Sequence, residues 1–202
     1  RDLGLNRLSL GVQSADAADL RVLARMHRWE DSIEAVSAAR RAGFGNVSLD
    51  LMFGLPDQTM EGWLTTLDSC LQLEPDHLSL YALTLEPGTP LAEAVTMGWV
   101  SQPDGDLAAD MYEAASEQLQ DSGFWQYEIS NWARASVPAP KYWALPPDGR
   151  TELIGPHVCA HNLIYWRNEP WLGFGAGAHP GFGRRRCSTH TQSRVFINEI
   201  RS

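Results

Sequence analysis

Three polar side chains are of types that bind polar ligands, and two of them, Gln13 and Asp50, lie on segments that otherwise have the pattern of buried strands. Asp50 interrupts the apolar alternation of residues 47–53 near the carboxyl end of that segment. A buried carboxylate must be paired with a cation or with hydrogen-bond donors. Gln13 ends the segment 6–14 and can donate and accept hydrogen bonds together, as recognition of a polar cofactor edge requires. Arg25 follows an apolar run, and its guanidinium can bind a carboxylate through two parallel hydrogen bonds.

Each of these residues also has a structural interpretation. Asp50 could instead be paired with a nearby arginine such as Arg25 in a buried ion pair. Gln13 could cap its strand, and Arg25 could be an ordinary arginine on a helix surface. A third possibility is that Asp50 acts as the base of a (β/α) barrel enzyme. The residues alone leave these interpretations open.

Strand and helix patterns alternate along the first two thirds of the chain. Apolar alternation predicts strands, and apolar residues at helical spacing predict helices between them. The predicted strands cover residues 6–14, 46–54, 77–85 and 125–130, and the predicted helices cover 30–44, 59–73 and 106–122. This alternation is typical of βαβ units and a parallel sheet.

The polar residues favour a barrel over a doubly wound sheet. Gln13, Asp50, Thr84 and Glu128 all lie at or near the carboxyl ends of successive predicted strands, which converge on one face in a barrel. A doubly wound sheet would concentrate function at one switch point, and no GxGxxG follows any strand. We therefore expect an α/β fold with a (β/α) barrel, or part of one, over residues 1–134.

Composition restricts the function classes. The chain has 202 residues, with 25 acidic against 16 basic, for a net charge of −9. This balance argues against nucleic-acid binding, which needs a basic face, and the short arginine cluster 184–186 is expected to be a solvated turn. No apolar run approaches the length of a membrane span and no signal peptide opens the chain, so a cytoplasmic protein is expected. The first residue, Arg1, enters in the middle of a pattern, so we expect a piece of a longer chain.

The last third differs in character. Residues 135–156 contain five prolines and are expected to form a loop or surface insertion. Residues 157–202 begin with a segment rich in tryptophan, tyrosine and glycine and are expected to form a separate, mixed C-terminal region.

Several motifs occur in the order seen in one family. They are RLSLGVQS, the Arg25-Met26-His27 step, VSLDLMFGLPDQT, HLSLYALTLEPGTPL, QYEISNWA and HNLIYW…LGFGAGAH. On these motifs the chain resembles the oxygen-independent coproporphyrinogen III oxidase-like radical S-adenosylmethionine (SAM) proteins, and among them the haem chaperones of the HemW type. The resemblance covers nearly the whole chain except the proline-rich stretch.

The resemblance implies a radical-SAM partial barrel of six βα units, of which this chain would hold the later three. It places contacts to SAM on Gln13, Arg25 and Asp50. It also implies a [4Fe-4S] cluster held by a CxxxCxxC loop, because a compact cluster needs closely spaced thiolates. The three cysteines at 70, 159 and 187 do not have that spacing. The cluster ligands are therefore expected outside this chain, which alone should be inactive.

Two histidines are candidate haem ligands. His161 stands in the HNxxYW motif that marks the haem-chaperone branch, where a neutral imidazole can ligate haem iron. The adjacent Tyr165 and Trp166 can pack on a porphyrin face. His179 in GAGAH is a second candidate. A hydrogen-bonded structural role remains open for both.

The resemblance implies a haem chaperone that holds haem and transfers it to haem-accepting respiratory proteins, and an acceptor at the membrane is compatible with this role. The alternative within the family is an enzyme that decarboxylates two propionates of coproporphyrinogen III. The first predicted strand would form the edge of an interrupted barrel, so self-association is also expected.

Overall fold

The computed structural model describes residues 4–135, 155–182 and 185–201, and the chain divides into two compact units, residues 1–158 and 159–202. Each unit is described by itself. The expected proline-rich loop at 135–156 lies almost wholly outside the described residues.

The first unit is built on a five-stranded sheet with the order β1-β2-β3-β5-β4. The strands are β1 (Leu8–Gln13), β2 (Val47–Phe53), β3 (His77–Ala82), β4 (Phe124–Glu128) and β5 (Asn131–Arg134). The first three are parallel neighbours, whereas β5 pairs antiparallel with both β3 and β4. The sheet is therefore an open, mixed α/β sheet that curves as part of a barrel and does not close.

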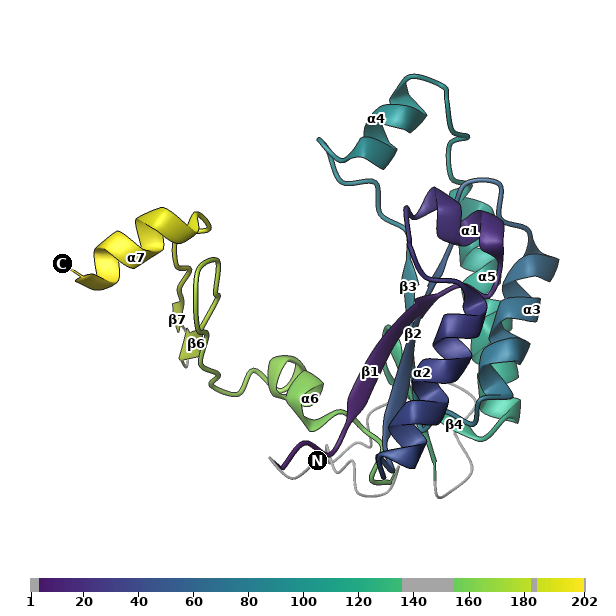
Figure 1. Cartoon of the computed structure of the whole chain (residues 1–202), viewed down its shortest axis with the longest axis horizontal. Helices are drawn as coiled ribbons and strands as arrows, with labels where there is room; N and C mark the ends of the chain where they lie inside the picture. Colours follow the sequence, from purple (N-terminus) through teal and green to yellow (C-terminus); the bar gives the residue numbers. More distant parts are fainter. Residues whose placement is uncertain (1–3, 136–154, 183–184, 202) are drawn as a thin grey trace. The chain divides into compact units, whose positions relative to one another are not determined.

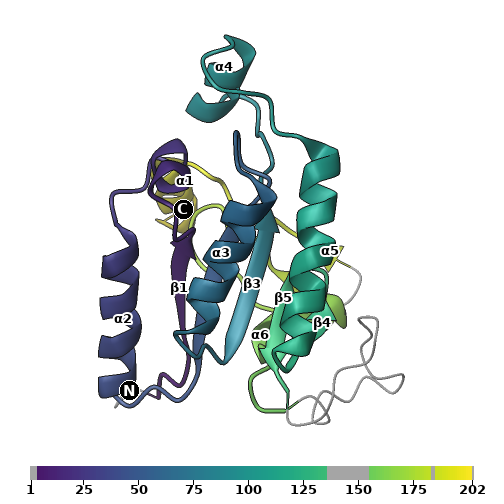
Figure 2. The ribbon, with the colours of Figure 1, turned by 90° about the vertical axis from the view of Figure 1, so that its right-hand side faces the viewer.

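Helices cover one face of this sheet. The first unit contains α1 (Ala17–Val22), α2 (Trp29–Arg41), α3 (Met60–Leu71), α4 (Pro90–Thr96) and α5 (Gly105–Asp121). Figure 2 shows α2, α3 and α5 side by side over the sheet. Side-chain oxygens cap the amino ends of α1, α3, α4 and α5, where unpaired backbone N–H groups need an acceptor. The capping residues are Asp16, Thr59, Thr89 and Asp104.

The hydrophobic core lies between the sheet and these helices. Alternate residues of a strand point to the same face, and in β2 the residues at 47, 49, 51 and 53 are all buried. They pack against apolar positions of the helices at three- and four-residue spacing, among them Val36, Trp63, Leu67, Met111 and Leu119. The opposite face of the sheet is left for polar residues.

The last predicted strand is a hairpin rather than a single strand. The expected strand at 125–130 is observed as β4, and after a two-residue turn the chain returns as β5, which lies between β3 and β4. Trp132 and Ala133 are fully buried in β5. Strand β4 therefore runs in the same direction as β1, β2 and β3, but β5 separates it from β3 and pairs antiparallel with both.

Helix α4 is an excursion from the sheet. Figures 1 and 2 both show it beyond the carboxyl ends of the strands, and none of its residues is buried. The side chains of Met97 and Trp99, which follow it, are 64% and 77% exposed. The sequence patterns did not predict this helix.

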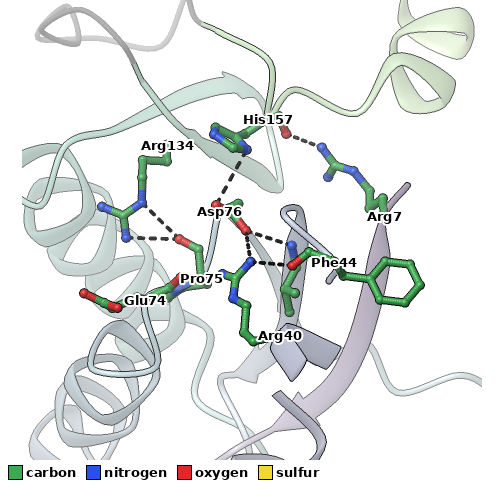
Figure 3. A network of polar contacts seen from close by, with 9 residues as sticks. Arg7, Arg40, Phe44, Glu74, Pro75, Asp76, Arg134 and His157 are labelled. Atoms are coloured by element: carbon green, nitrogen blue, oxygen red, sulfur yellow. Dashed lines mark hydrogen bonds and ion pairs between the residues drawn. The ribbon is translucent and has the colours of Figure 1, made fainter. Parts of the chain in front are cut away.

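A polar network centred on Asp76 joins segments at the amino end of β3 (Figure 3). Asp76 accepts hydrogen bonds of 2.7 Å from Arg40 and 2.9 Å from the backbone N–H of Val47. His157 Nδ1 lies 3.7 Å from its other oxygen, and the guanidinium of Arg7 donates to the His157 carbonyl. These contacts tie α2, β2 and the segment around His157 together, so we assign the network to the fold.

His77 begins β3 beside this network and is buried. Its Nδ1 lies 2.8 Å from the Ser48 hydroxyl and its Nε2 lies 2.8 Å from the Tyr127 hydroxyl. Burial, with a further contribution from the positive charge of Arg7, lowers the pKa of His77 to about 3. The imidazole is therefore neutral at physiological pH and joins β2, β3 and β4 through hydrogen bonds.

The second unit contains α6 (Ala160–Trp166), β6 (Gly181–Phe182), β7 (Arg185–Arg186) and α7 (Ser193–Arg201). Strands β6 and β7 form an antiparallel pair. The expectation of a solvated turn at 184–186 is wrong for Arg185 and Arg186, because both residues are in a strand, although both remain exposed.

In the described residues, every helix is too short or too polar to cross a membrane.

Candidate functional site

The face of the sheet opposite the helices carries a row of polar residues at one level. The strand register pairs Gly11 with Asp50, Asp50 with Ser79, and Ser79 with Asn131. Glu128 at the end of β4 pairs with Asn131. Because partners in neighbouring strands point to the same face, this polar row crosses all five strands.

Asp50 lies at the fourth of the seven positions of β2, further from the strand end than expected. Its carboxylate accepts hydrogen bonds of 2.8 and 3.0 Å from the Ser9 hydroxyl. Burial raises the pKa of Asp50, and the nearby hydroxyl groups of Ser9 and Ser79 oppose that shift. No ion pair joins Asp50 to Arg25 or to another cation in the described parts of the chain. The carboxylate is held by hydroxyl groups alone, and its charge is incompletely compensated.

Beside Asp50, its register partner Ser79 begins a chain of hydrogen bonds across the rest of the sheet. The Ser79 hydroxyl donates to the side-chain oxygen of Asn131 at 2.6 Å, and the Asn131 amide nitrogen donates to Glu128. The other Glu128 oxygen accepts from the backbone N–H of Ser130 at 3.2 Å. One face of the sheet therefore carries two carboxylates, half-buried Asp50 and buried Glu128, with neutral polar groups between them.

Gln13 lies beside Asp50. It is the last residue of β1, follows an irregularity in the register and has φ 68°, in the left-handed region. A Cβ added to Gly11 would lie 2.7 Å from the Gln13 amide nitrogen, so the amide lies over Gly11. Since Gly11 is the register partner of Asp50, the structure brings Gln13 and Asp50 to adjacent places on the polar face.

Arg25 lies on the loop between α1 and α2 and is exposed. Together with Arg21, Arg28 and other loop residues it lines a cavity of about 450 Å³. His27 Nε2 lies 3.1 Å from the Val12 carbonyl oxygen, which ties this loop to the end of β1. No hydrogen bond or ion pair joins Arg25 to Gln13 or Asp50 within the described residues. The structure thus ties this loop to β1 but does not bring Arg25 into contact with the polar face.

His161 and Tyr165 form a pair on one side of α6, as residues four apart in a helix do. The Tyr165 hydroxyl lies 3.0 Å from His161 Nε2, and the two rings meet edge to face at 5.2 Å between centroids. His161 is exposed, and the Tyr165 and Trp166 side chains are 42% and 44% exposed. If Nε2 carries the proton to Tyr165, Nδ1 has the lone pair that a metal requires.

His179 takes part in the second unit mainly through its backbone. Its carbonyl oxygen accepts a 2.6 Å hydrogen bond from the Trp171 indole, and its side chain is exposed. The preceding Gly175 and Gly177 have φ of 90° and 75°, a region that side chains strongly disfavour. These glycines form the turn that brings the His179 carbonyl to Trp171.

The cysteines show no arrangement for a metal cluster. Cys70 is buried in the core, and burial raises the pKa of its thiol to about 12, so it is protonated and a poor metal ligand. Cys159 is half-buried and Cys187 is exposed. Among the described residues no three histidine, cysteine or acidic side chains form a group that could hold a metal ion.

The sequence patterns missed the serines and the asparagine of the polar row. Ser9 and Ser79 alternate with leucines in their strands, as Asp50 does. This alternation places all three side chains on the face opposite the leucines, so the sequence could have identified the two serines. Asn131 gave no such signal, because β5 was not predicted.

Comparison with known proteins identifies relatives over nearly the whole chain. Residues 1–70 match the family model of the Radical SAM superfamily. The mouse protein "Radical S-adenosyl methionine domain-containing protein 1, mitochondrial" is 42% identical over 189 residues, which are 94% of this chain and 38% of that protein. "Heme chaperone HemW" of Bacillus subtilis is 37% identical over 200 residues, covering 99% of this chain and 48% of that protein. The chain therefore spans less than half the length of these curated relatives.

One solved structure has the same fold over the whole chain. Coproporphyrinogen III oxidase (HemN) from Escherichia coli, described as a radical SAM enzyme, superposes with a TM-score of 0.75 over 100% of this chain and 44% of that chain. The sequence identity is 20%, so this likeness concerns the fold. It confirms the expected partial barrel of radical-SAM type.

Proposed function

The chain belongs to the radical SAM superfamily, and from this membership we propose that it is part of a haem chaperone, which holds haem and delivers it to haem proteins. The observation that carries the proposal is the 37% identity with the Bacillus subtilis haem chaperone across 99% of the chain. That span includes α6 with the HNxxYW motif.

The second unit offers groups suited to haem. His161 is an exposed imidazole that can present one nitrogen to iron while the other remains bonded to Tyr165. The partly exposed rings of Tyr165 and Trp166 supply apolar area on which a porphyrin can pack. His161 is therefore the proposed haem ligand, and the side chain of His179 is the second candidate.

The polar face of the first unit is the proposed SAM site. SAM carries hydroxyl, ammonium and carboxylate groups, and an incompletely compensated carboxylate beside an amide is suited to hold such groups. Asp50 would accept hydrogen bonds from hydroxyl or ammonium groups, and Gln13 would both donate and accept. Arg25, which lines a cavity on the loop between α1 and α2, would bind the carboxylate of SAM.

SAM and a [4Fe-4S] cluster together supply radical chemistry in this superfamily. The described residues fit SAM better than they fit the cluster, because Cys70 is a protonated core thiol and no candidate metal group is found among them. We propose that the cluster ligands lie outside residues 1–202, and that the residues described above bind and orient SAM alone.

Delivery of haem requires an acceptor, and we propose haem-accepting respiratory proteins for this role, including acceptors at a membrane. The alternative, decarboxylation of coproporphyrinogen III, draws on the name of a structural neighbour that shares only the fold at 20% identity. The chaperone has the stronger support, since the relatives named as haem chaperones are the more similar in sequence.

Titration of the protein with ferric haem, followed by absorbance, tests the proposal beside an anaerobic assay of coproporphyrinogen III turnover. We expect a saturable complex with one haem per chain and no loss of carboxylate from coproporphyrinogen. Turnover of coproporphyrinogen without stable haem binding would contradict the proposal and favour the enzyme.

The SAM site is tested separately by equilibrium dialysis of SAM with Asp50→Asn and Gln13→Ala. Each change removes a bond to a charged or strongly polar group, which corresponds to about 1.5–3 kcal/mol of binding free energy. Both variants should therefore bind SAM more weakly than the parent. Unchanged SAM affinity in both would remove Gln13 and Asp50 from the site.

A further inference from the structure

The two units have opposite charge. Residues 159–202 contain six arginines and two acidic residues, whereas residues 1–158 contain ten basic and twenty-three acidic residues. The unit that carries His161 is therefore the basic part of an acidic chain. Arginines can bind the carboxylates of a ligand, and exposed aromatic rings can pack against its flat apolar part.

Arg186 in β7 is held in place by two contacts. Its guanidinium lies over the Trp171 ring, 4.2 Å from the centroid, and donates a 2.8 Å hydrogen bond to the side-chain oxygen of Asn168. A Cβ added to Gly181 would lie 2.7 Å from both the guanidinium and the Trp171 ring. A glycine at 181 thus makes room for the stacked pair, and the guanidinium is fixed although the side chain is exposed.

Aromatic contacts connect this guanidinium to His161. The Trp171 ring meets the Tyr165 ring edge to face at 4.8 Å, and Tyr165 in turn meets His161 at 5.2 Å. His161, Tyr165, Trp171 and Arg186 therefore form a continuous row, with an imidazole at one end and a fixed cation at the other. We call these four residues the aromatic row.

We propose that Arg186 binds a propionate carboxylate of haem whose iron is held at His161. The inference rests on the proposed function and adds the group that recognises the acidic edge of the ligand. Haem carries its iron at the centre and its propionates on one edge, and the aromatic row separates a metal ligand from a cation by three successive contacts of 5.2, 4.8 and 4.2 Å. A guanidinium has five N–H donors, and after the bond to Asn168 the remaining ones can bind a carboxylate in bidentate geometry.

The test compares ferric haem with its dimethyl ester, which keeps the macrocycle and iron but has no propionate charge. Arg186→Gln should weaken haem affinity about three- to tenfold, the range expected for a partly exposed charged hydrogen bond, and should leave affinity for the ester unchanged. Arg185→Gln is the matched control. It removes the same charge from the same strand, but adjacent strand residues point to opposite faces, so its haem affinity should stay within about twofold of the parent.

The outcomes separate this proposal from the proposed function. Equal haem affinity of the Arg186 and Arg185 variants would overturn the propionate contact while leaving haem binding intact. Equal weakening of haem and ester in Arg186→Gln would assign Arg186 to the packing of Trp171 and would also overturn it. A parent protein that binds neither compound would contradict the haem chaperone itself, and the propionate site with it.

Discussion

Asp50 differs from a buried structural carboxylate because its partners are hydroxyl groups. Ser9 donates to it at 2.8 Å, and no cation pairs with it among the described residues. Burial therefore raises its pKa, whereas a neighbouring cation would lower it. The charged form of Asp50 is thus disfavoured by burial, and the ammonium or hydroxyl groups of a ligand can stabilise it.

Replacement of Asp50 by Asn should not destabilise the protein at neutral pH. A carboxyl group with a raised pKa in the folded state contributes stability that is present below its unfolded value of 3.8, and this contribution is lost as pH rises through the folded pKa. The Asn variant has no carboxyl group at this position and does not lose this stability. The free energy of unfolding of the variant minus that of the parent should therefore increase from about pH 4 toward pH 8. Urea unfolding of both proteins across that range measures the difference.

Loss of about 3–5 kcal/mol of stability in Asp50→Asn at pH 7 would contradict this, because such a loss is typical of breaking a buried ion pair. Ser9→Ala is a useful control. It removes the main hydrogen-bond donor but keeps the carboxylate, so it should raise the pKa of Asp50 further and lower stability at neutral pH.

At this scale the sequence predicted which residues are candidates but not how they meet. The alternation of residues 47–53 made Asp50 conspicuous, and the end of the first strand did the same for Gln13. The position of the Gln13 amide over Gly11 depends on a register irregularity and a φ of 68°. Those features arise from pairing between strands distant in sequence, which local patterns do not contain.

At the scale of elements, Gly54 sets how closely the end of β2 approaches α5. It has φ 68°, and an added Cβ would lie 2.9 Å from the Cβ of Ala108. Gly54→Ala should therefore lower the free energy of unfolding by about 1–3 kcal/mol, as overpacking of a core does. Chemical denaturation measures the change.

Gly45→Ala is the matched control for Gly54→Ala. It lies in the loop before the same strand, and nothing lies within 4 Å of an added Cβ. Its stability should stay within about 0.5 kcal/mol of the parent. Equal effects of the two substitutions would show that the contact between β2 and α5 is not responsible.

The hydrogen bonds of His77 should make the pairing of β2, β3 and β4 sensitive to acid. Its pKa falls from 6.5 to about 3 on folding, so the unfolded chain binds a proton below pH 6.5 that the folded protein does not bind. The contribution of His77 to the free energy of unfolding is therefore fully present above pH 6.5 and is lost as pH falls toward 3. The loss for this one group is at most about 1.4 kcal/mol per pH unit. His77→Gln should show a shallower loss of stability between pH 7 and pH 5 in denaturation experiments.

Tyr127→Phe provides the comparison for His77→Gln, because it removes one hydrogen-bond partner and keeps the imidazole. Its stability should be lower than that of the parent, with a similar slope against pH. If His77→Gln and the parent lose stability in parallel as pH falls, the buried imidazole is not the acid-sensitive group.

The sequence predicted some strands of the sheet and missed another. The parallel strands β1, β2 and β3 were predicted because each has an apolar alternation and a helix after it. Strand β5 was missed, since it has four residues and lies directly before the proline-rich stretch. Trp132 in β5 is buried because it pairs with β3, which is distant in the sequence. Such a contact produces no periodic pattern of apolar residues in the four-residue strand itself.

At the scale of the whole molecule, β1 is an edge strand with one strand neighbour in the described sheet. The backbone N–H of Leu8 donates to the carbonyl oxygen of Asn46, directly before β2, so the N–H of the next residue, Ser9, points away from the sheet. An unpaired edge can pair with another chain, and we expect the chain to self-associate as concentration rises. Light scattering over a dilution series measures this.

Ser9→Pro should reduce that self-association, because proline is tolerated where the N–H faces away from the ladder and blocks pairing along the edge. A monodisperse monomer at all concentrations for the parent chain would show that the β1 edge does not recruit a second copy.

The division into two units leads to the central claim, that haem is held by the unit bearing His161 and SAM by the polar face bearing Asp50. The most direct measurement is the haem dissociation constant of the parent, His161→Ala and Asp50→Asn, obtained by absorbance titration under one set of conditions. The account predicts that His161→Ala weakens haem binding by at least about tenfold, which is about 1.4 kcal/mol. Asp50→Asn should bind haem as the parent does. Parental haem affinity in His161→Ala, or an equal loss in both variants, would contradict the account.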